Sequence, residues 1–309
     1  MPEDSPIKAN AMNKIKIVRL ISILGMGMYA PMEVEAQSSQ NPSPMVEHVR
    51  EHPRLTKTSP AGRREKLNLG QLFIPEAVVM DQSGSASPLV IAFHCGDWIP
   101  EMAVAGLSKP LPCISMQLGS GSGRYSKPFV DDRQLFGRIV GEAETKLGRP
   151  VSKLLLVGWS AGYGAIRELI SDVEYEPRIS SVLLLDGLHT GYVGGKPGPL
   201  ESKLEEGPLK PFLAFARKAI KGEKQFHYLH TEIFPGTFAS TTETADWLLA
   251  QLALKRKAVL RWGPMRTQHL AETVEGRLRI DAFAGNSAPD HVDLLHGLPL
   301  ILQDLVNAR

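Results

Sequence analysis

Ser160 is the residue whose surroundings point most directly to chemistry in this sequence of 309 residues. It lies in the run LLLVGWSAGYG (154–164), where Gly158, Ser160 and Gly162 match the pattern GxSxG. Apolar residues precede the motif and a helical pattern follows it at 161–170, so the serine falls where a buried strand turns into a helix. Glycines permit the tight backbone of such a turn, and the hydroxyl then stands above the carboxyl edge of the sheet. Ser160 is therefore predicted to be a nucleophile; the alternative is a serine that only caps a helix.

The sequence resembles the α/β-hydrolase family over about residues 66–298. The resemblance rests on an apolar strand that ends in His94-Cys95-Gly96, on the GWSAG motif, and on a late histidine after the last strand. It implies an oxyanion hole formed by the backbone N–H groups of Gly96 and Ala161. Cys95 stands where the family's commonest pattern has a glycine. His94 is interpreted as a structural turn residue rather than as a base.

The base that takes the serine proton is expected after the last strand, because the family order is serine, acid, histidine. Among the nine histidines, His291 and His296 meet this condition. They lie about 140° apart around a helix, so they cannot both face the serine. The resemblance implies a base at a junction of loop and helix, where His291 lies, whereas His296 falls inside the helix. His291 is the predicted base and His296 the alternative, and a structural role for both stays open.

Two carboxylates are candidates for the acid that would orient this histidine. Asp186 ends the apolar strand VLLLD and is followed by Gly187, and some α/β-hydrolases take their acid from this strand. Glu232 follows the next strand, which is the more usual position in the family. An aspartate at a strand end often only forms a turn, and a glutamate near Pro235 could simply be exposed. Asp186 is the preferred acid and Glu232 the alternative.

The elements around these residues alternate between short apolar runs and helical patterns from about Lys66 onward. This alternation predicts an α/β protein with a single doubly wound, mostly parallel sheet and helices on both faces, as in the α/β-hydrolase fold. Strands are expected at 67–74, 89–93, 114–118, 153–157, 182–185, 226–230 and 278–283. Residues 257–262 could be a strand or an irregular edge.

Two helices have recognisable starts. A glycine-rich loop at 119–125 is followed by a helix that begins at Asp131 or Asp132 and ends before Gly148. The sequence Ser240-Thr-Thr-Glu243 is a capping box that predicts the start of a second helix.

Composition argues against several classes of function. The chain has 35 basic and 33 acidic residues, and no run of Lys and Arg that would bind phosphates, so nucleic acid is not an expected partner. Cys95 and Cys113 are the two cysteines; we expect free thiols in or beside buried strands, with a disulfide in an oxidising compartment as the alternative. No CxxC occurs, and His227 and His230 would point to opposite faces of a strand, so no metal site is expected. Serine chemistry requires no cofactor.

The first residues are typical of an export leader. The segment MNKIKIVR (12–19) is basic, the run 20–32 is apolar but short for a bilayer span, and 34–36 (VEA) offers small residues to a signal peptidase. We therefore expect residues 1–36 to be a signal peptide and the mature protein to be secreted or periplasmic, without stable membrane insertion. The alternatives are a disordered cytosolic extension or an uncleaved anchor.

Residues 37–63 are rich in Ser, Pro and Gln and predict a linker, which leaves residues 64–309 as the α/β-hydrolase domain. The combined hypothesis is an exported serine hydrolase that cleaves a carboxylic ester or related acyl bond of a small molecule through an acyl-enzyme. Its pocket is expected to be bordered by 187–206, Tyr125, Trp98 and Tyr163. The alternatives are a peptidase or acyltransferase on the same scaffold, or a catalytically silent binding protein with this fold.

Overall fold

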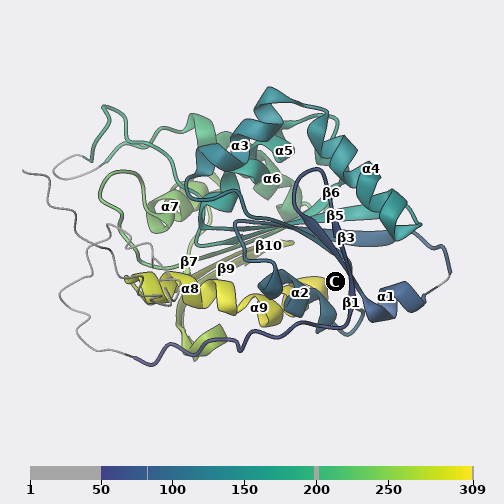
Figure 1. Ribbon diagram of the computed structural model, residues 1–309. Helices are drawn as coiled ribbons and strands as arrows, with labels where there is room; N and C mark the ends of the chain where they lie inside the picture. Colours follow the sequence, from purple (N-terminus) through teal and green to yellow (C-terminus); the bar gives the residue numbers. More distant parts are fainter. Residues whose placement is uncertain (1–49, 82, 198–201, 308–309) are drawn as a thin grey trace, which may run out of the picture. The chain divides into compact units, whose positions relative to one another are not determined.

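A ten-stranded sheet is the centre of the fold in the computed structural model, which describes residues 50–81, 83–197 and 202–307 (Figure 1). The spatial order of its strands is β1-β2-β4-β3-β5-β6-β7-β10-β9-β8. In chain order the strands are β1 (Gly62–Lys66), β2 (Gln71–Pro75), β3 (Ser87–Phe93), β4 (Cys113–Met116), β5 (Val151–Trp159), β6 (Ile179–Leu185), β7 (Gln225–His230), β8 (Lys257–Trp262), β9 (Gln268–Glu275) and β10 (Leu278–Phe283). Strands β4, β3, β5, β6, β7 and β10 pair in parallel, and the strands at both edges pair antiparallel. The predicted single, mostly parallel sheet is confirmed.

Helices cover both faces of this sheet (Figure 1). Helices α3 to α7 pack on one face, and α2, α8 and α9 on the other. The helices are α1 (Glu76–Met80), α2 (Trp98–Ala105), α3 (Ser122–Asp131), α4 (Leu135–Leu147), α5 (Tyr163–Ser171), α6 (Lys210–Ile220), α7 (Thr241–Gln251), α8 (Ala288–His296) and α9 (Leu298–Asn307). Short 3₁₀ turns are η1 (Ser160–Gly162), η2 (Glu176–Arg178), η3 (Gly207–Leu209) and η4 (Pro264–Arg266). This is the layered arrangement of the α/β-hydrolase fold.

Strand β5 shows why the apolar runs are continuous rather than alternating. Leu154 and Leu156 belong to the core under α3 to α7, whereas Leu155 and Val157 belong to the core under α2, α8 and α9. Successive side chains of a strand point to opposite faces, so a strand that is covered on both faces needs apolar residues at every position. The same pattern made β3, β5 and β6 recognisable in the sequence.

The strand expected at 67–74 is wrong in its bounds, because the chain reverses there between β1 and β2. The Leu67 N–H donates to the Gly70 carbonyl at 3.1 Å, which closes a tight turn. Gly70 has a φ of 89°, and a Cβ at this position would lie 2.6 Å from the Ser115 carbonyl oxygen. Only glycine fits this turn, and a continuous strand cannot pass through it.

The stretch 119–125 is not a loop throughout, since α3 begins at Ser122. The following helix, α4, begins at Leu135 rather than at Asp131 or Asp132. Asp132 instead ends α3, where its N–H donates to the Pro128 carbonyl at 3.2 Å. Helix α3 was not predicted because it contains Gly123 and Pro128, which disfavour a helix.

In the C-terminal half, the sequence predicted the start of α7 but left the structure of residues 257–262 open. The capping box of α7 is confirmed: Ser240 Oγ accepts from the Glu243 N–H at 3.1 Å, and the Ser240 N–H donates to Glu243 Oε2 at 2.8 Å. Residues 257–262 form β8, an edge strand whose side chains are largely exposed. An exposed edge strand carries no buried apolar pattern, which is why the sequence did not place it.

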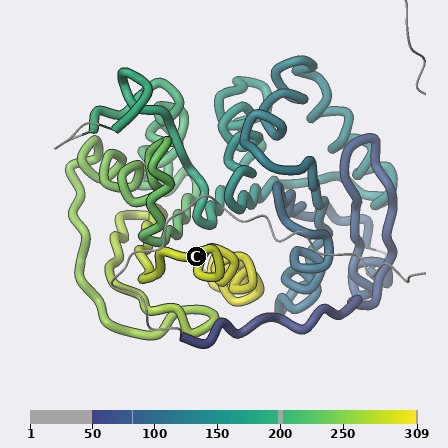
Figure 2. The backbone as a smooth tube through the Cα atoms, turned by 60° about the vertical axis from the view of Figure 1, so that its left-hand side comes forward, coloured from purple at the N-terminus to yellow at the C-terminus, as the bar shows by residue number. Residues whose placement is uncertain are grey.

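The described chain starts with residues 50–61, which contain no helix or strand. These residues pass the turn between β8 and β9 and then the C-terminal helices before they reach β1 (Figure 2). The predicted signal peptide, residues 1–36, lies outside the described residues, as do residues 37–49 of the predicted linker. Among the helices of the described chain, none has the length and apolar character that a membrane crossing needs.

Candidate active site

Ser160 lies at a sharp bend between β5, which ends at Trp159, and α5, which begins at Tyr163. Its φ of 47° is in the left-handed region, which costs a non-glycine residue about 1–2 kcal/mol. The bend is also tightly packed: a Cβ at Gly162 would lie 2.4 Å from the Phe93 carbonyl oxygen, at the end of β3. A tight bend between strand and helix, with glycines two residues to either side of the serine, is what the GxSxG pattern predicted.

The Ser160 side chain does not cap a helix. Neither η1 nor α5 has a side-chain cap, and Ser160 Oγ has no hydrogen-bond partner within the described chain. Ser160 is partly exposed and borders a cavity of about 490 Å³. The interpretation of this residue as a capping serine is therefore wrong, and its hydroxyl is free to meet a ligand.

Asp186 and His291 line the same cavity and contact each other. Asp186 follows β6, and its Oδ2 lies 2.8 Å from Nδ1 of His291, in the first turns of α8. An ionised carboxylate can only accept, so His291 Nδ1 carries the proton and Nε2 is left as the basic atom. The carboxyl ends of parallel strands meet at one edge of the sheet, which is why residues distant in sequence converge here.

Asp186 is buried, with 2% of its surface exposed, and is surrounded by donors. The Thr231 N–H, the Thr231 hydroxyl and the Thr241 hydroxyl donate to it at 2.9, 2.6 and 2.8 Å. Burial by itself raises the pKa of Asp186, but the hydrogen bonds from His291 and Thr231 outweigh it and hold the pKa well below its usual range. Asp186 is therefore ionised at neutral pH and polarises the His291 ring.

Trp159 packs against the His291 ring. The two ring centroids are 4.7 Å apart, and Trp159 Nε1 donates to the His291 carbonyl at 3.1 Å. Trp159 also stacks on His94, with ring centroids 5.0 Å apart, and His94 Nδ1 lies 2.7 Å from the Tyr125 hydroxyl. Burial, with a contribution from His291, lowers the pKa of His94 to about 4. His94 is thus a neutral packing residue, in agreement with its interpretation as structural.

The two alternative site residues lie elsewhere. His296 Nδ1 accepts the Leu55 N–H at 3.0 Å, and its ring packs edge-on against Trp98 at 5.6 Å. Glu232 is exposed, and its N–H donates to the Gly285 carbonyl at 2.9 Å. Neither residue lines the cavity that Ser160 borders, as far as the described chain shows. The structure brings Asp186 and His291 together and leaves both alternatives outside.

The two predicted oxyanion-hole residues differ in position. Ala161 borders the cavity next to Ser160. Gly96 accepts the Ile99 N–H at 3.1 Å at the start of α2, and it is not among the described residues that line the cavity. Gly121 and Ser122, where α3 begins, border the cavity. Gly96 as second donor stays a prediction.

The remaining walls of the cavity are apolar and aromatic with a few polar groups. His189 packs edge-on against Tyr163 and Phe238, and its Nδ1 donates to the Ala239 carbonyl at 2.8 Å. Burial lowers the pKa of His189, so the ring is neutral and its Nε2 is an acceptor. The full lining consists of Gly121, Ser122, Ser160, Ala161, Tyr163, Arg167, Asp186, His189, Thr190, Gly191, Pro208, Ile233, Phe238, Thr241 and His291.

Within the predicted stretch 187–206, residues 189–191 border the cavity, as does Tyr163, whereas Tyr125 and Trp98 are not among the described residues that line it. Sequence reasoning also missed Thr231 and Thr241, the hydroxyl donors to Asp186. Thr231 directly follows β7 at the carboxyl edge of the sheet, so its position was a usable signal. Thr241 lies in the capping box, where its second role could not be recognised.

The cysteines are both buried and free, as predicted. Burial raises the pKa of the Cys95 thiol to about 12. The described chain contains two groups with metal-ligand spacing, His52–Asp290–Asp293 and His269–Glu272–Asp281. In both, arginines pair with the carboxylates, so the residues present form ion-pair clusters rather than cation sites.

Comparisons with known proteins give similarities in architecture. No family model matches the sequence, and no curated protein matches it. Among solved structures, an esterase from Pyrobaculum calidifontis is 13% identical, with a TM-score of 0.47 over 80% of this chain and 85% of that one. EstE1, a carboxylesterase from a metagenomic library, is also 13% identical, with a TM-score of 0.48 over 82% and 92%. An IroE-like serine hydrolase from Shewanella oneidensis is 19% identical, with a TM-score of 0.42 over 79% and 80%. The assignment of a reaction to this chain rests on its own residues.

Proposed function

We propose that this chain is a serine hydrolase that cleaves a carboxylic ester or a related acyl bond. The observation that carries the proposal is the 2.8 Å contact between His291 Nδ1 and Asp186 Oδ2, on the same cavity as the free hydroxyl of Ser160. A nucleophile, a base and an acid that orients the base are the parts that acyl transfer through a serine needs. No residue of this set requires a cofactor.

The proposed reaction begins when Ser160 Oγ attacks the substrate carbonyl carbon and His291 Nε2 takes the hydroxyl proton. The carbonyl oxygen becomes an oxyanion, which the Ala161 N–H and the predicted Gly96 N–H would stabilise. The tetrahedral intermediate collapses as His291 Nε2 gives its proton to the leaving alcohol, and an acyl-Ser160 ester remains. Water, deprotonated by His291 Nε2, then attacks the acyl carbon; as the bond to Ser160 Oγ breaks, His291 Nε2 returns the proton to this oxygen and the carboxylic acid leaves.

The cavity supports a small-molecule substrate. Its volume of about 490 Å³ is within the range of about 300–1,000 Å³ that small-molecule pockets occupy. Tyr163, Phe238 and Ile233 provide apolar surface for an acyl or alcohol group, and His189 provides an acceptor. A peptidase or acyltransferase would use the same serine chemistry with another leaving group or acceptor, and a silent binding protein would use the cavity alone.

Hydrolysis of a panel of p-nitrophenyl esters by the wild type and Ser160→Ala tests the proposal. Ser171→Ala is a matched control, since Ser171 is exposed at the far end of α5. We expect wild-type and Ser171→Ala activity on short acyl chains, and none above background for Ser160→Ala with an unchanged Tm. Activity that persists in Ser160→Ala would refute the nucleophile assignment. An amide panel and an alcohol acceptor in the same assay separate the peptidase and acyltransferase alternatives.

We also propose that the protein is exported, on the sequence of residues 12–36 alone: a basic segment, a short apolar run and a small-residue cleavage site. Sequencing the N-terminus of protein recovered from a bacterial periplasm or medium tests this proposal. The expected first residue is Gln37, whereas an intact Met1 would contradict cleavage.

A further inference from the structure

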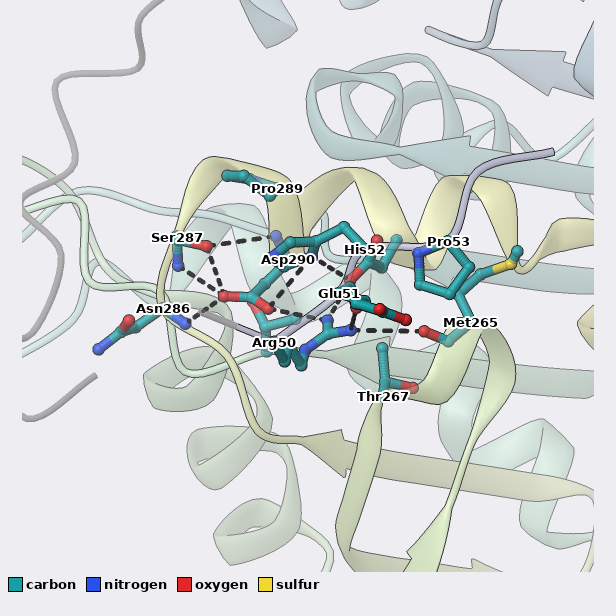
Figure 3. Close-up of polar contacts among 12 residues, drawn as sticks. Arg50, Glu51, His52, Pro53, Met265, Thr267, Asn286, Ser287, Pro289 and Asp290 are labelled. Carbon is teal, nitrogen blue, oxygen red and sulfur yellow. Dashed lines mark hydrogen bonds and ion pairs between the residues drawn. The ribbon is translucent and has the colours of Figure 1, made fainter. Parts of the chain in front are cut away.

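A short segment of the predicted linker lies against α8, the helix that carries His291. We call Arg50–Leu55 the strap; it has no helix or strand of its own. Figure 3 shows Arg50 reaching Asp290 of α8 and the backbone of Met265, in the turn between β8 and β9. The strap is therefore bound to two parts of the fold that are more than 200 positions away in the sequence.

The strap supplies the charges that two buried carboxylates of α8 require. The Asp293 side chain is 0% exposed, and it accepts from Arg50 Nη2, Arg54 Nη1 and, at 2.8 Å, His52 Nδ1. Asp290 accepts from Arg50 Nη2 at 2.8 Å. A buried carboxylate without partners is strongly disfavoured, so the two guanidinium groups stabilise the buried positions of Asp290 and Asp293 on α8.

The contacts extend along the whole helix. Arg54 Nη2 donates to the Pro289 carbonyl at 3.0 Å in the first turn, and the Leu55 N–H donates to His296 Nδ1 at 3.0 Å at the last residue. Asp290 also completes the helix cap, because its Oδ2 accepts the Ser287 N–H at 3.0 Å. The strap thus contacts the start, the middle and the end of α8, a helix of nine residues.

His291 lies between the two carboxylates in sequence but points away from the strap, toward Asp186 and Trp159. Residues 290 and 293 share one side of a helix, and residue 291 lies about 100° around from residue 290. A rotation or shift of α8 would therefore move the imidazole relative to Asp186 and Ser160. Misplacement by about 1 Å can cost a hundredfold in rate.

We infer that the strap is a positioning element of the proposed hydrolase: Arg50 and Arg54, by neutralising Asp290 and Asp293, fix α8 so that His291 meets Asp186 and faces Ser160. The inference rests on the proposed function for its kinetic consequence. His52, Asp290 and Asp293, which have metal-ligand spacing, then form an ion-pair cluster with the strap arginines, because guanidinium groups already pair with both carboxylates. The polar segment before β1 thereby has a role in the reaction.

The test compares Arg50→Gln/Arg54→Gln with Arg50→Lys/Arg54→Lys, in full-length protein processed as in the wild type. Lys57→Gln is the matched control, since Lys57 is an exposed cation just beyond the strap. The kinetic readouts are kcat and KM for a p-nitrophenyl ester. The second readout is the downfield proton resonance of His291 Nδ1–H, identified by its loss in His291→Ala. This resonance reports the contact with Asp186 without any turnover.

For the glutamine pair we expect kcat to fall about tenfold to a hundredfold with KM changed less than about twofold, and the downfield resonance to broaden or vanish. The lysine pair should keep most of the kcat, and Lys57→Gln all of it. A folded glutamine pair with wild-type kcat and resonance, even with a lower Tm, would overturn the inference. Equal losses in the lysine and glutamine pairs would contradict the role of charge.

If the glutamine pair does not fold, Arg54→Gln alone decides, because Arg50 remains on Asp293 while the Pro289 contact is lost. A folded single variant should show a lower kcat and a shifted resonance, and wild-type values for both would overturn the inference. Activity that survives Ser160→Ala would instead refute the proposed function, and it would leave the resonance test of the strap intact.

Discussion

Replacement of Asp186 by Asn should change the hydrogen bonds to His291 and leave the backbone in place. Asp186 has a φ of 45°, a conformation that Asn tolerates better than Ala, so the backbone should not change. Four neighbouring groups, His291 Nδ1, the Thr231 N–H, the Thr231 hydroxyl and the Thr241 hydroxyl, donate to the carboxylate in the wild type. An amide has one acceptor oxygen and an NH₂ group that can only donate. The Thr231 N–H is fixed by the backbone and will hold the amide oxygen.

The amide NH₂ then faces His291 Nδ1, which must become an acceptor. The imidazole proton moves to Nε2, and the atom that should take the Ser160 proton is already protonated. In a serine protease triad the same aspartate replacement lowers kcat by about 10⁴, which is about 5.5 kcal/mol of transition-state stabilisation. We expect a loss of about 10³ to 10⁴ in kcat here, with KM within about threefold of the wild type, because the cavity walls are unchanged.

The assay is steady-state hydrolysis of a p-nitrophenyl ester, with Asp131→Asn as control, since Asp131 is exposed and pairs with Lys127 on the surface of α3. Because the pKa of Asp186 is depressed in the folded state, its ionisation stabilises the fold above the unfolded pKa of about 4, and this stabilisation is lost as pH falls below that value. The stability difference between wild type and Asp186→Asn should therefore shrink in acid. A variant with near wild-type kcat would refute the assignment of the acid, and a large loss in Glu232→Gln would transfer the role to that residue.

Further predictions follow from neighbouring groups. His291→Ala should lower kcat/KM by at least about 10³, whereas His296→Ala should stay within about tenfold, and the reverse order would show that the base is misassigned. Because the pKa of His94 is lowered to about 4 in the fold, protonation favours unfolding, so the free energy of unfolding should fall as pH drops from about 6.5 toward 4. His94→Asn should remove that part of the pH dependence in urea titrations, and an identical pH profile would contradict it. Cys95 and Cys113 should react with a thiol reagent only after denaturation, and fast labelling of native protein would contradict their burial.

The nucleophile bend was predictable because its information is local. The glycines on either side of Ser160, the apolar residues of β5 and the start of α5 all lie within a few positions of it. The contact between Asp186 and His291 was predictable from topology, since both follow parallel strands at the same edge of the sheet. The choice between Asp186 and Glu232 was not, because it depends on whether the side chain is buried among Thr231 and Thr241 or points to solvent.

The contacts of the strap could not be predicted, because they are made to residues that are distant in the sequence. Arg50, His52 and Arg54 follow no apolar period, and a polar segment rich in Ser and Pro predicts exposed chain. Their partners, Asp290 and Asp293, are on a helix about 240 positions away. The sequence does not show whether a charged residue is exposed or pairs with a buried residue of opposite charge. The same holds for β8, whose exposed side chains carry no apolar pattern.

Covalent labelling of Ser160 by a fluorophosphonate tests the central claim most directly, because it requires both a free hydroxyl and a working base but no knowledge of the substrate. The account predicts stoichiometric modification of the native protein, with the adduct located on the peptide that contains Ser160. It also predicts that His291→Ala reacts far more slowly and Ser160→Ala not at all. A native wild-type protein that stays unmodified, or that carries the adduct on another serine, would contradict the account.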